Sequence, residues 1–253
     1  MLGVHTPDKG PVMTASIQVA RQYMSFDRSE DRQTAVLDLS GVVLDDQGKP
    51  VAGFKDKLDL AVYFPQYVGQ PRRDLVYNFQ SPLKPGLYQV RVAARDGKTG
   101  RTGSAIDWIE IPDLSANKLS LSSLILGETP REAVVNASSS SAPAAALVSV
   151  DRRFPRSSRL RLLTYIYNAA RGADGAAAPD VALEVQILHN EQAVLTNPLH
   201  KIEPIPGGDP AAIPYAAEVP LAALVPGRYV LQVTAIDRIG KTSVSQSAGF
   251  DVE

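Results

Sequence analysis

Two kinds of short pattern in this chain have residue types that could bind a cation or a phosphate. Asp38-Leu-Ser40-Gly-Val42 matches the start of Asp-x-Ser-x-Ser, a loop whose hard oxygen atoms can ligate a divalent cation. Gly97-Lys-Thr99 and Gly240-Lys-Thr242 match the end of a phosphate-binding loop. The first pattern lacks its second Ser, and the other two lack the upstream Gly and the following helix. We therefore predict no metal site and no cofactor, and we interpret both Gly-Lys-Thr segments as hairpin turns.

The residues that could perform nucleophilic or acid–base catalysis are few. The chain has no Cys and no Gly-x-Ser-x-Gly segment, and its three histidines are His5, His189 and His200. None of them has neighbours at the spacing of a metal site or a catalytic triad. We predict that the protein is not an enzyme. A hydrolase whose site assembles around His189 or His200 is the alternative from the enzyme class.

The elements that would position any site are strands, and two of them repeat one pattern. Residues 83–96 and 224–237 both read Leu-x-Pro-Gly-x-Tyr followed by apolar alternation and a final Asp, 141 positions apart. Pro-Gly indicates a turn, and the alternation places one face of a strand in a core. Tyr88 and Tyr229 stand where a tyrosine corner is expected in a Greek-key sandwich. We assign structural roles to these tyrosines and to the turn glycines Gly86 and Gly227.

Short apolar runs separated by Gly, Pro, Asp and Asn continue along the chain, without a helical period after the first thirty residues. This pattern predicts an all-β protein of two tandem immunoglobulin-like or fibronectin III-like sandwiches. The first domain spans residues 1–113 with an N-terminal extension, and the second spans 118–253. The second contains a flexible Ser- and Ala-rich loop at 128–146, and the hinge between the domains lies at 112–117. The expected strands are 15–22, 34–44, 57–64, 74–79, 87–95, 104–111, 119–126, 159–168, 181–189, 193–197, 215–219, 228–237 and 245–252.

Composition excludes several classes of partner. The 253 residues include 26 basic and 27 acidic side chains, so no excess of positive charge indicates nucleic acid. No apolar stretch is long enough to insert into a membrane, and the first ten residues lack the pattern of an export signal. We expect the chain to be a piece of a longer protein.

Aromatic residues are 6% of the chain, and Trp108 is its only tryptophan. The alternation in its strand places Ile109 and Ile111 inward and Trp108 outward. Trp108 would then pack against the hinge or the second domain, or contact a ligand. With Lys98 and Lys241 in the repeated turns, Trp108 forms the candidate binding surface. Pro112 and Pro220 stand beside strands, so a partner strand could add only at other sheet edges.

The order of several segments resembles the C-terminal region of von Willebrand factor A-related proteins of the acidobacterial type. The resemblance rests on residues 83–96, 98–105, 109–113 and 119–126, and it continues through Arg153-Phe154 and 165–168 to the second repeat. It implies an exported bacterial protein with an upstream A domain that binds metal and mediates adhesion. This chain lacks that domain, so metal-dependent adhesion is assigned to none of its residues.

These observations favour a non-catalytic structural or protein-interaction module of a larger exported or cell-surface bacterial protein. Its expected partners are other proteins or other domains of the larger chain. The alternative is an accessory module that binds a carbohydrate or a peptide, with Trp108 or the turns at Gly97 and Gly240 in contact with the ligand.

Overall fold

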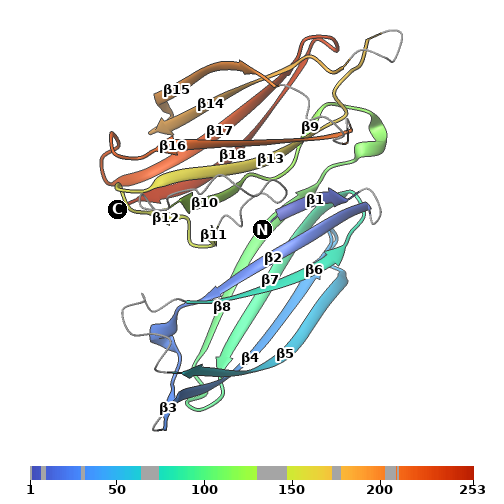
Figure 1. The fold of residues 1–253 in the computed structure, drawn as a ribbon. Coiled ribbons are helices and arrows are strands. Elements are labelled where there is room, and N and C mark those ends of the chain that lie inside the picture. The colour runs from blue at the N-terminus through green and yellow to red at the C-terminus, as the bar shows by residue number, and fades with distance from the viewer. Residues whose placement is uncertain are drawn as a thin grey trace. The chain divides into compact units, whose positions relative to one another are not determined.

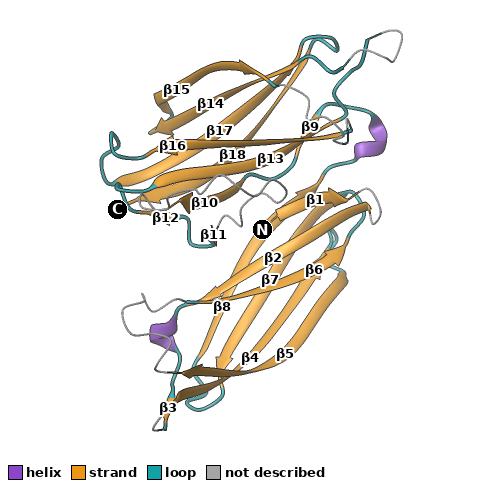
Figure 2. Cartoon of the chain, in the orientation of Figure 1, coloured by secondary structure: helices purple, strands orange, loops and turns teal. Residues whose placement is uncertain are grey.

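A computed structural model of the chain describes residues 2–6, 10–29, 32–63, 74–129, 147–172, 178–202, 209 and 211–253. Within these residues the regular elements are strands and two short 3-10 helices, and the sheets remain open (Figures 1 and 2). The predicted all-β sandwich class is confirmed. The chain divides into two compact units, Met1–Ile111 and Pro112–Glu253.

Two sheets build the first unit. In the larger sheet, β4 pairs with β5 on one side and with β7 on the other, β7 pairs with β8, and β3 pairs with the start of β4. The smaller sheet has the order β1-β2-β6, and the 3-10 helix η1 follows β2. The elements are β1 (Leu2–Thr6), β2 (Gly10–Val19), η1 (Arg21–Tyr23), β3 (Asp27–Arg28), β4 (Arg32–Leu44), β5 (Pro50–Tyr63), β6 (Leu75–Pro82), β7 (Gly86–Asp96) and β8 (Thr102–Ile111).

Alternating side chains and one tight turn explain the long hairpin of β4 and β5. Residues 35, 37, 39 and 43 of β4 are buried, which is the period expected when one face of a strand packs on a core. A tight turn joins β4 and β5. Asp45 Oδ1 accepts hydrogen bonds from the backbone N–H of Gln47 at 3.0 Å and of Lys49 at 2.8 Å. Gly48 has a φ of 79°, a conformation that glycine adopts without strain.

The core of the first unit lies toward one end of its sandwich. It consists of the buried residues Met13, Ala15, Val43, Leu83, Tyr88, Val90, Ile109 and Ile111. At the β5–β6 side, the Phe54 ring stacks against the rings of Tyr77 and Phe79, with centroid distances of 5.2 and 4.8 Å. These aromatic side chains close that side of the unit.

The second unit also has two sheets. One has the order β11-β10-β13-β16 with β9 paired to β13, and the other has the order β12-β18-β17-β14-β15. β12 pairs with β18 in parallel, and the other pairs are antiparallel. The elements are η3 (Leu114–Ala116), β9 (Ser120–Leu121), β10 (Ile125–Thr129), β11 (Leu147–Val148), β12 (Arg153–Phe154), β13 (Arg159–Tyr167), β14 (Val181–His189), β15 (Gln192–Lys201), β16 (Ala212–Pro220), β17 (Gly227–Asp237) and β18 (Thr242–Val252).

The pairing pattern of the first unit recurs in the second. β7 and β8 correspond to β17 and β18, because Gly86 lies opposite Ile111 and Gly227 lies opposite Val252 at the same offset of 141. β4 pairs with β7 and β5 as β14 pairs with β17 and β15. β2 pairs with β6 and β1 as β13 pairs with β16 and β10. The sequence repeat therefore corresponds to a repeated arrangement of strands.

Several boundaries differ from those expected. The strand expected at 119–126 is divided into β9 and β10, and β10 continues to Thr129, so residues 128 and 129 of the predicted loop belong to a strand. Residues 130–146 lie outside the described residues. The expected hinge at 112–117 belongs to the second unit. There Asn168 Nδ2 donates hydrogen bonds to the carbonyl oxygens of Leu114 at 2.8 Å and Lys118 at 3.3 Å. This amide ties the linker segment to the end of β13.

Candidate functional site

The repeated glycines and tyrosines lie at the starts of β7 and β17, directly after a turn. The Tyr88 hydroxyl donates a hydrogen bond to the Lys84 carbonyl oxygen at 2.9 Å, and the Tyr229 hydroxyl donates to the Val225 carbonyl oxygen at 2.8 Å. Both rings are buried. Gly86 and Gly227 have φ values of 151° and 157°, which side chains of L-residues disfavour. The two hydrogen bonds and the two φ values support the structural roles predicted for these tyrosines and glycines.

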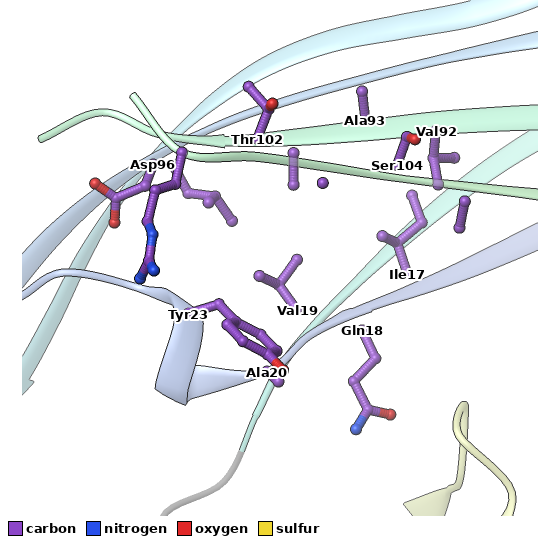
Figure 3. Close-up of a pocket in the computed structure, with 15 residues that line it drawn as sticks. Ile17, Gln18, Val19, Ala20, Tyr23, Val92, Ala93, Asp96, Thr102 and Ser104 are labelled. Atoms are coloured by element: carbon purple, nitrogen blue, oxygen red, sulfur yellow. The ribbon is translucent and has the colours of Figure 1, made fainter. Parts of the chain in front are cut away.

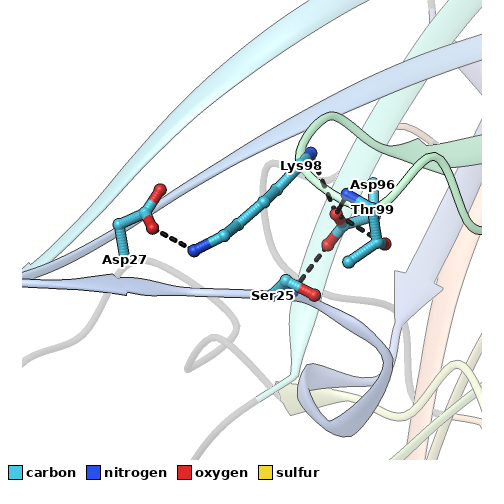
Figure 4. A network of polar contacts seen from close by, with 5 residues as sticks. All are labelled: Ser25, Asp27, Asp96, Lys98 and Thr99. Carbon is cyan, nitrogen blue, oxygen red and sulfur yellow. Dashed lines mark hydrogen bonds and ion pairs between the residues drawn. The ribbon is translucent and has the colours of Figure 1, made fainter.

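The aspartate that ends the first repeat, Asp96, is buried and accepts four hydrogen bonds (Figure 4). Its Oδ1 accepts from the backbone N–H groups of Lys98 at 3.0 Å and Thr99 at 2.7 Å, and from the Thr99 hydroxyl at 2.9 Å. Its Oδ2 accepts from the backbone N–H of Ser25 at 2.6 Å. One carboxylate therefore holds the β7–β8 turn and the segment that follows β2.

The second unit repeats this arrangement at Asp237. Its Oδ1 accepts from the backbone N–H groups of Ile239 at 3.0 Å and Gly240 at 2.9 Å. Its Oδ2 accepts from the backbone N–H of Ala170, which follows β13, at 2.6 Å. The two Gly-Lys-Thr segments are hairpin turns, as predicted, and each turn is closed by the carboxylate before it.

Hydrogen bonding lowers the pKa of Asp96 to about 2. The largest cause is the bond from the Thr99 backbone N–H, followed by the bond from the Ser25 backbone N–H. Burial acts in the opposite direction, since it favours the neutral acid, but the N–H donors outweigh it. Asp96 is therefore ionised in the folded unit at neutral pH and serves as a structural anion.

Within the first unit, two of the residues predicted to form the binding surface, Lys98 and Trp108, lie apart. Lys98 forms an ion pair with the carboxylate of Asp27 on β3 (Figure 4). Trp108 lies opposite Gln89, seven residues along β7 from Asp96, so about 20 Å of strand separates it from the Lys98 turn. Lys241 lies in a turn of the second unit, exposed and with a φ of 51°. We therefore examined Trp108 and its neighbours as a candidate binding surface.

Two other exposed apolar side chains lie on the same face of the β7–β8 hairpin as Trp108. Ile106, Trp108 and Leu87 are 61%, 54% and 48% exposed. Ile106, Trp108 and Glu110 are alternate residues of β8, so their side chains lie on the same face. Leu87 lies opposite Glu110 in the β7–β8 register, and its side chain therefore lies on that face as well. We call Leu87, Ile106 and Trp108 the outer patch. Ile109 and Ile111 are buried on the other face, as predicted.

The fold does not require large apolar residues at these positions. At the same register in the second unit, Arg228 corresponds to Leu87, Ser247 to Ile106 and Gly249 to Trp108. Since the same hairpin forms there with polar or small residues, packing within the unit does not explain the outer patch. Exposed apolar clusters with a polar rim are typical of interaction sites.

The histidines considered for a hydrolase have the following surroundings. His189 Nδ1 lies 3.0 Å from the carbonyl oxygen of Arg228, and its ring lies 4.8 Å from the Tyr229 ring. His200 is exposed on β15 opposite Leu183. The side chain of His5 lies outside the described residues. Within the described residues, no cluster of three or more His, Cys, Asp or Glu side chains could hold a metal ion.

Comparison with known proteins assigns this chain to no family, because no family model matches it and no curated protein matches it. None of the helices in the described ranges is long and apolar enough to cross a membrane.

Proposed function

We propose that the chain is a non-catalytic protein-interaction module of a larger exported or cell-surface bacterial protein. The observation that carries the proposal is the outer patch of Leu87, Ile106 and Trp108 on a hairpin whose copy in the second unit has polar or small residues there. Location outside the cell and the immunoglobulin-like character of the sandwiches belong to the proposal and rest on the resemblances of the sequence.

The chemistry of the outer patch suits a protein partner. Trp108 offers a large side chain that loses little conformational freedom on binding, and Ile106 lies two residues away on the same face. Arg91 lies opposite Ile106, and Glu110 lies opposite Leu87, so exposed charges flank the apolar residues. An apolar centre with a charged rim is the usual anatomy of a transient protein interface.

A carbohydrate-binding module is the second candidate, because an exposed indole can stack on the face of a sugar ring. Fewer residues support this second candidate. Trp108 is the only tryptophan, and the other two residues of the outer patch are aliphatic. Aliphatic side chains favour a protein surface over a sugar.

The test compares the chain with a double variant, Ile106→Ser with Trp108→Ser, in affinity capture from envelope fractions of the source bacterium. We expect the amount of one captured protein to fall at least about tenfold, which corresponds to about 1.4 kcal/mol of binding free energy. Both positions are exposed, so the free energy of unfolding should stay within about 0.5 kcal/mol of the original value.

Val230→Ser is the matched control, since Val230 is an exposed apolar residue on β17 of the second unit. It should retain the captured protein in full. Equal capture by the double variant would contradict the proposal. Binding to a defined glycan on an array, lost in the double variant, would replace it with the second candidate.

A further inference from the structure

The outer patch is one end of a larger surface, the outward face of the sheet that contains β5, β4, β7 and β8. Alternate residues of a strand share a face. On the β7–β8 hairpin, Val92 points toward Ile17 and Val19 of β2 (Figure 3). Ala93 and Thr102 point away from β2, on the face that carries the outer patch (Figure 3). This outward face is therefore the side of the sheet turned away from the core.

Basic side chains stand beside the outer patch on the outward face. Arg91 of β7 lies directly opposite Ile106 of β8. Four residues farther along β7, Arg95 lies opposite Asp38 of β4, and Lys57 of β5 lies opposite the same Asp38. Both arginines are exposed. Positive charge thus follows β7 away from the outer patch.

The basic side chains of this face keep their charge available for a partner. Among the described residues, Lys55, Lys57, Arg91 and Arg95 form no ion pair. Arg91 Nε donates a hydrogen bond to Oε1 of Gln89 at 2.6 Å, which holds the guanidinium beside the outer patch. The described part of the face has fewer acidic side chains than basic ones, and these are Asp38, Asp59 and Glu110.

A hollow of about 380 Å³ lies at the far end of the outward face, where the β7–β8 turn meets β3. Its charged lining residues are Lys57, Arg95 and Lys98 on one side of the balance and Asp27 and Asp38 on the other. Lys98 and Asp27 form an ion pair with each other (Figure 4). The excess positive charge in the hollow therefore comes from Lys57 and Arg95.

Small side chains occupy the outward face between the two arginines. Ser40, Ala93 and Ser104 lie opposite one another on β4, β7 and β8. A main chain that crosses the face between Arg91 and Arg95 can therefore come close to the sheet.

The second unit does not have the two arginines. At the same offset of 141, Gln232 corresponds to Arg91 and Ile236 corresponds to Arg95. The same pairing of strands forms there without positive charge at these positions. Folding therefore does not explain the two arginines of the first unit.

We propose that the outward face binds an extended acidic segment of a partner protein, with carboxylates on Arg91 and Arg95 and an apolar residue on the outer patch. This inference rests on the proposed function and names the chemistry of its partner. Arginine holds a carboxylate through two parallel hydrogen bonds, so the two guanidinium groups favour Asp and Glu side chains. Complementary charge of this kind gives an interface its specificity.

The geometry of β7 defines the spacing of side chains in the partner. Arg91 and Arg95 are four residues apart on one strand, which corresponds to about 13 Å. Alternate residues of an extended segment point the same way with the same rise, so acidic residues four positions apart reach both arginines. Trp108 lies opposite Gln89, two residues from Arg91. The apolar residue of the partner is therefore two positions from the nearer acidic residue.

The probe is a random peptide library displayed on phage and selected against the intact chain. We expect enrichment of peptides with Asp or Glu at two positions four apart and an apolar residue two positions from one of them. In the double variant Arg91→Gln with Arg95→Gln, the dissociation constant of a selected peptide, measured by calorimetry, should rise at least about tenfold. For the original chain it should also rise with salt, because ions screen exposed charges.

The double variant Arg238→Gln with Lys241→Gln is the matched control, since it removes the same charge from an exposed turn of the second unit. It should bind the selected peptide as the original chain does. Because Arg91 and Arg95 are exposed, their double variant should keep the urea midpoint of the original chain. A loss of peptide binding then reports on the surface and not on folding.

Several results would overturn the inference. They are enrichment of no peptide or of peptides without acidic residues, equal binding by the Arg91 and Arg95 double variant, and an equal loss in the matched control. Dimers of the original chain that the Arg91 and Arg95 double variant abolishes would overturn it in favour of a second copy. Binding of polygalacturonate to this face, without enrichment of any peptide, would overturn it in favour of an anionic polysaccharide.

The capture experiment separates this inference from the proposed function. We expect the Arg91 and Arg95 double variant to lose the same captured protein as the Ile106 and Trp108 double variant. If only the Ile106 and Trp108 double variant loses it, the acidic partner is wrong and the proposed function stands. If both double variants capture it in full, the proposed function is wrong as well.

Discussion

Asp96→Asn should lower the free energy of unfolding of the first unit by about 3 kcal/mol. The carboxylate accepts three hydrogen bonds on Oδ1 and one on Oδ2, all from groups of the chain itself. An amide has one oxygen and one NH₂ group, so at least one backbone N–H must face another donor. The variant loses charge-assisted bonds and leaves a buried donor unsatisfied, and each of these effects costs about 1–3 kcal/mol.

The same variant should change how stability depends on pH. The pKa of Asp96 is lowered to about 2 in the folded unit, from about 4 in an unfolded chain. Its stabilisation is therefore complete above about pH 4 and is lost as the pH falls toward 2. Asp96→Asn should remove this part of the acid dependence.

Urea unfolding measured by the fluorescence of Trp108 reports on the first unit, because the chain has no other tryptophan. Asp237→Asn is the matched control and should leave this fluorescence transition unchanged, since Asp237 holds the corresponding turn of the second unit. Equal urea midpoints for the original chain and Asp96→Asn would show that the Asp96 contacts do not stabilise the first unit.

Met13→Ala should destabilise the first unit by about 3 kcal/mol. Met13 is fully buried on β2, in the core cluster of the first unit. Truncation of a buried Met removes apolar contacts and leaves a cavity, which together cost about 2–5 kcal/mol.

Ile17→Ala on the same strand is the control for Met13→Ala. Ile17 is only partly buried, so its truncation should cost about 1 kcal/mol. The urea midpoint of Trp108 fluorescence distinguishes the two variants. A larger loss of stability at Ile17 than at Met13 would contradict the prediction that the buried position on β2 contributes more.

Local patterns in the sequence were sufficient for the sandwich class and for most long strands. The alternation before Asp96 and Asp237 fixed which residues face inward, and the same reasoning placed Trp108 outward and Ile109 inward. Gly97-Lys-Thr99 could be predicted as a turn because the upstream Gly and the following helix of a phosphate-binding loop are both absent from the sequence. These features depend on neighbours within a few residues, which a single sequence contains.

Other features depend on contacts that no local pattern contains. The bond from the Ser25 backbone to Asp96 joins residues 71 positions apart, and a backbone N–H can come from any residue type. The only signal was the Asp that ends each repeat, directly before the hairpin turn. The two-residue strands β3, β11 and β12 are too short to show a period.

The most direct test of the central claim is collisional quenching of Trp108 fluorescence by acrylamide in the free, intact chain. We expect the indole to be about half as accessible as in the same chain unfolded in urea, because the outer patch is open to solvent. We also expect the partner captured through Ile106 and Trp108 to shield the indole. Strong shielding of Trp108 in the free chain would contradict the proposed function, since the outer patch would then be covered within the chain and unable to receive a partner.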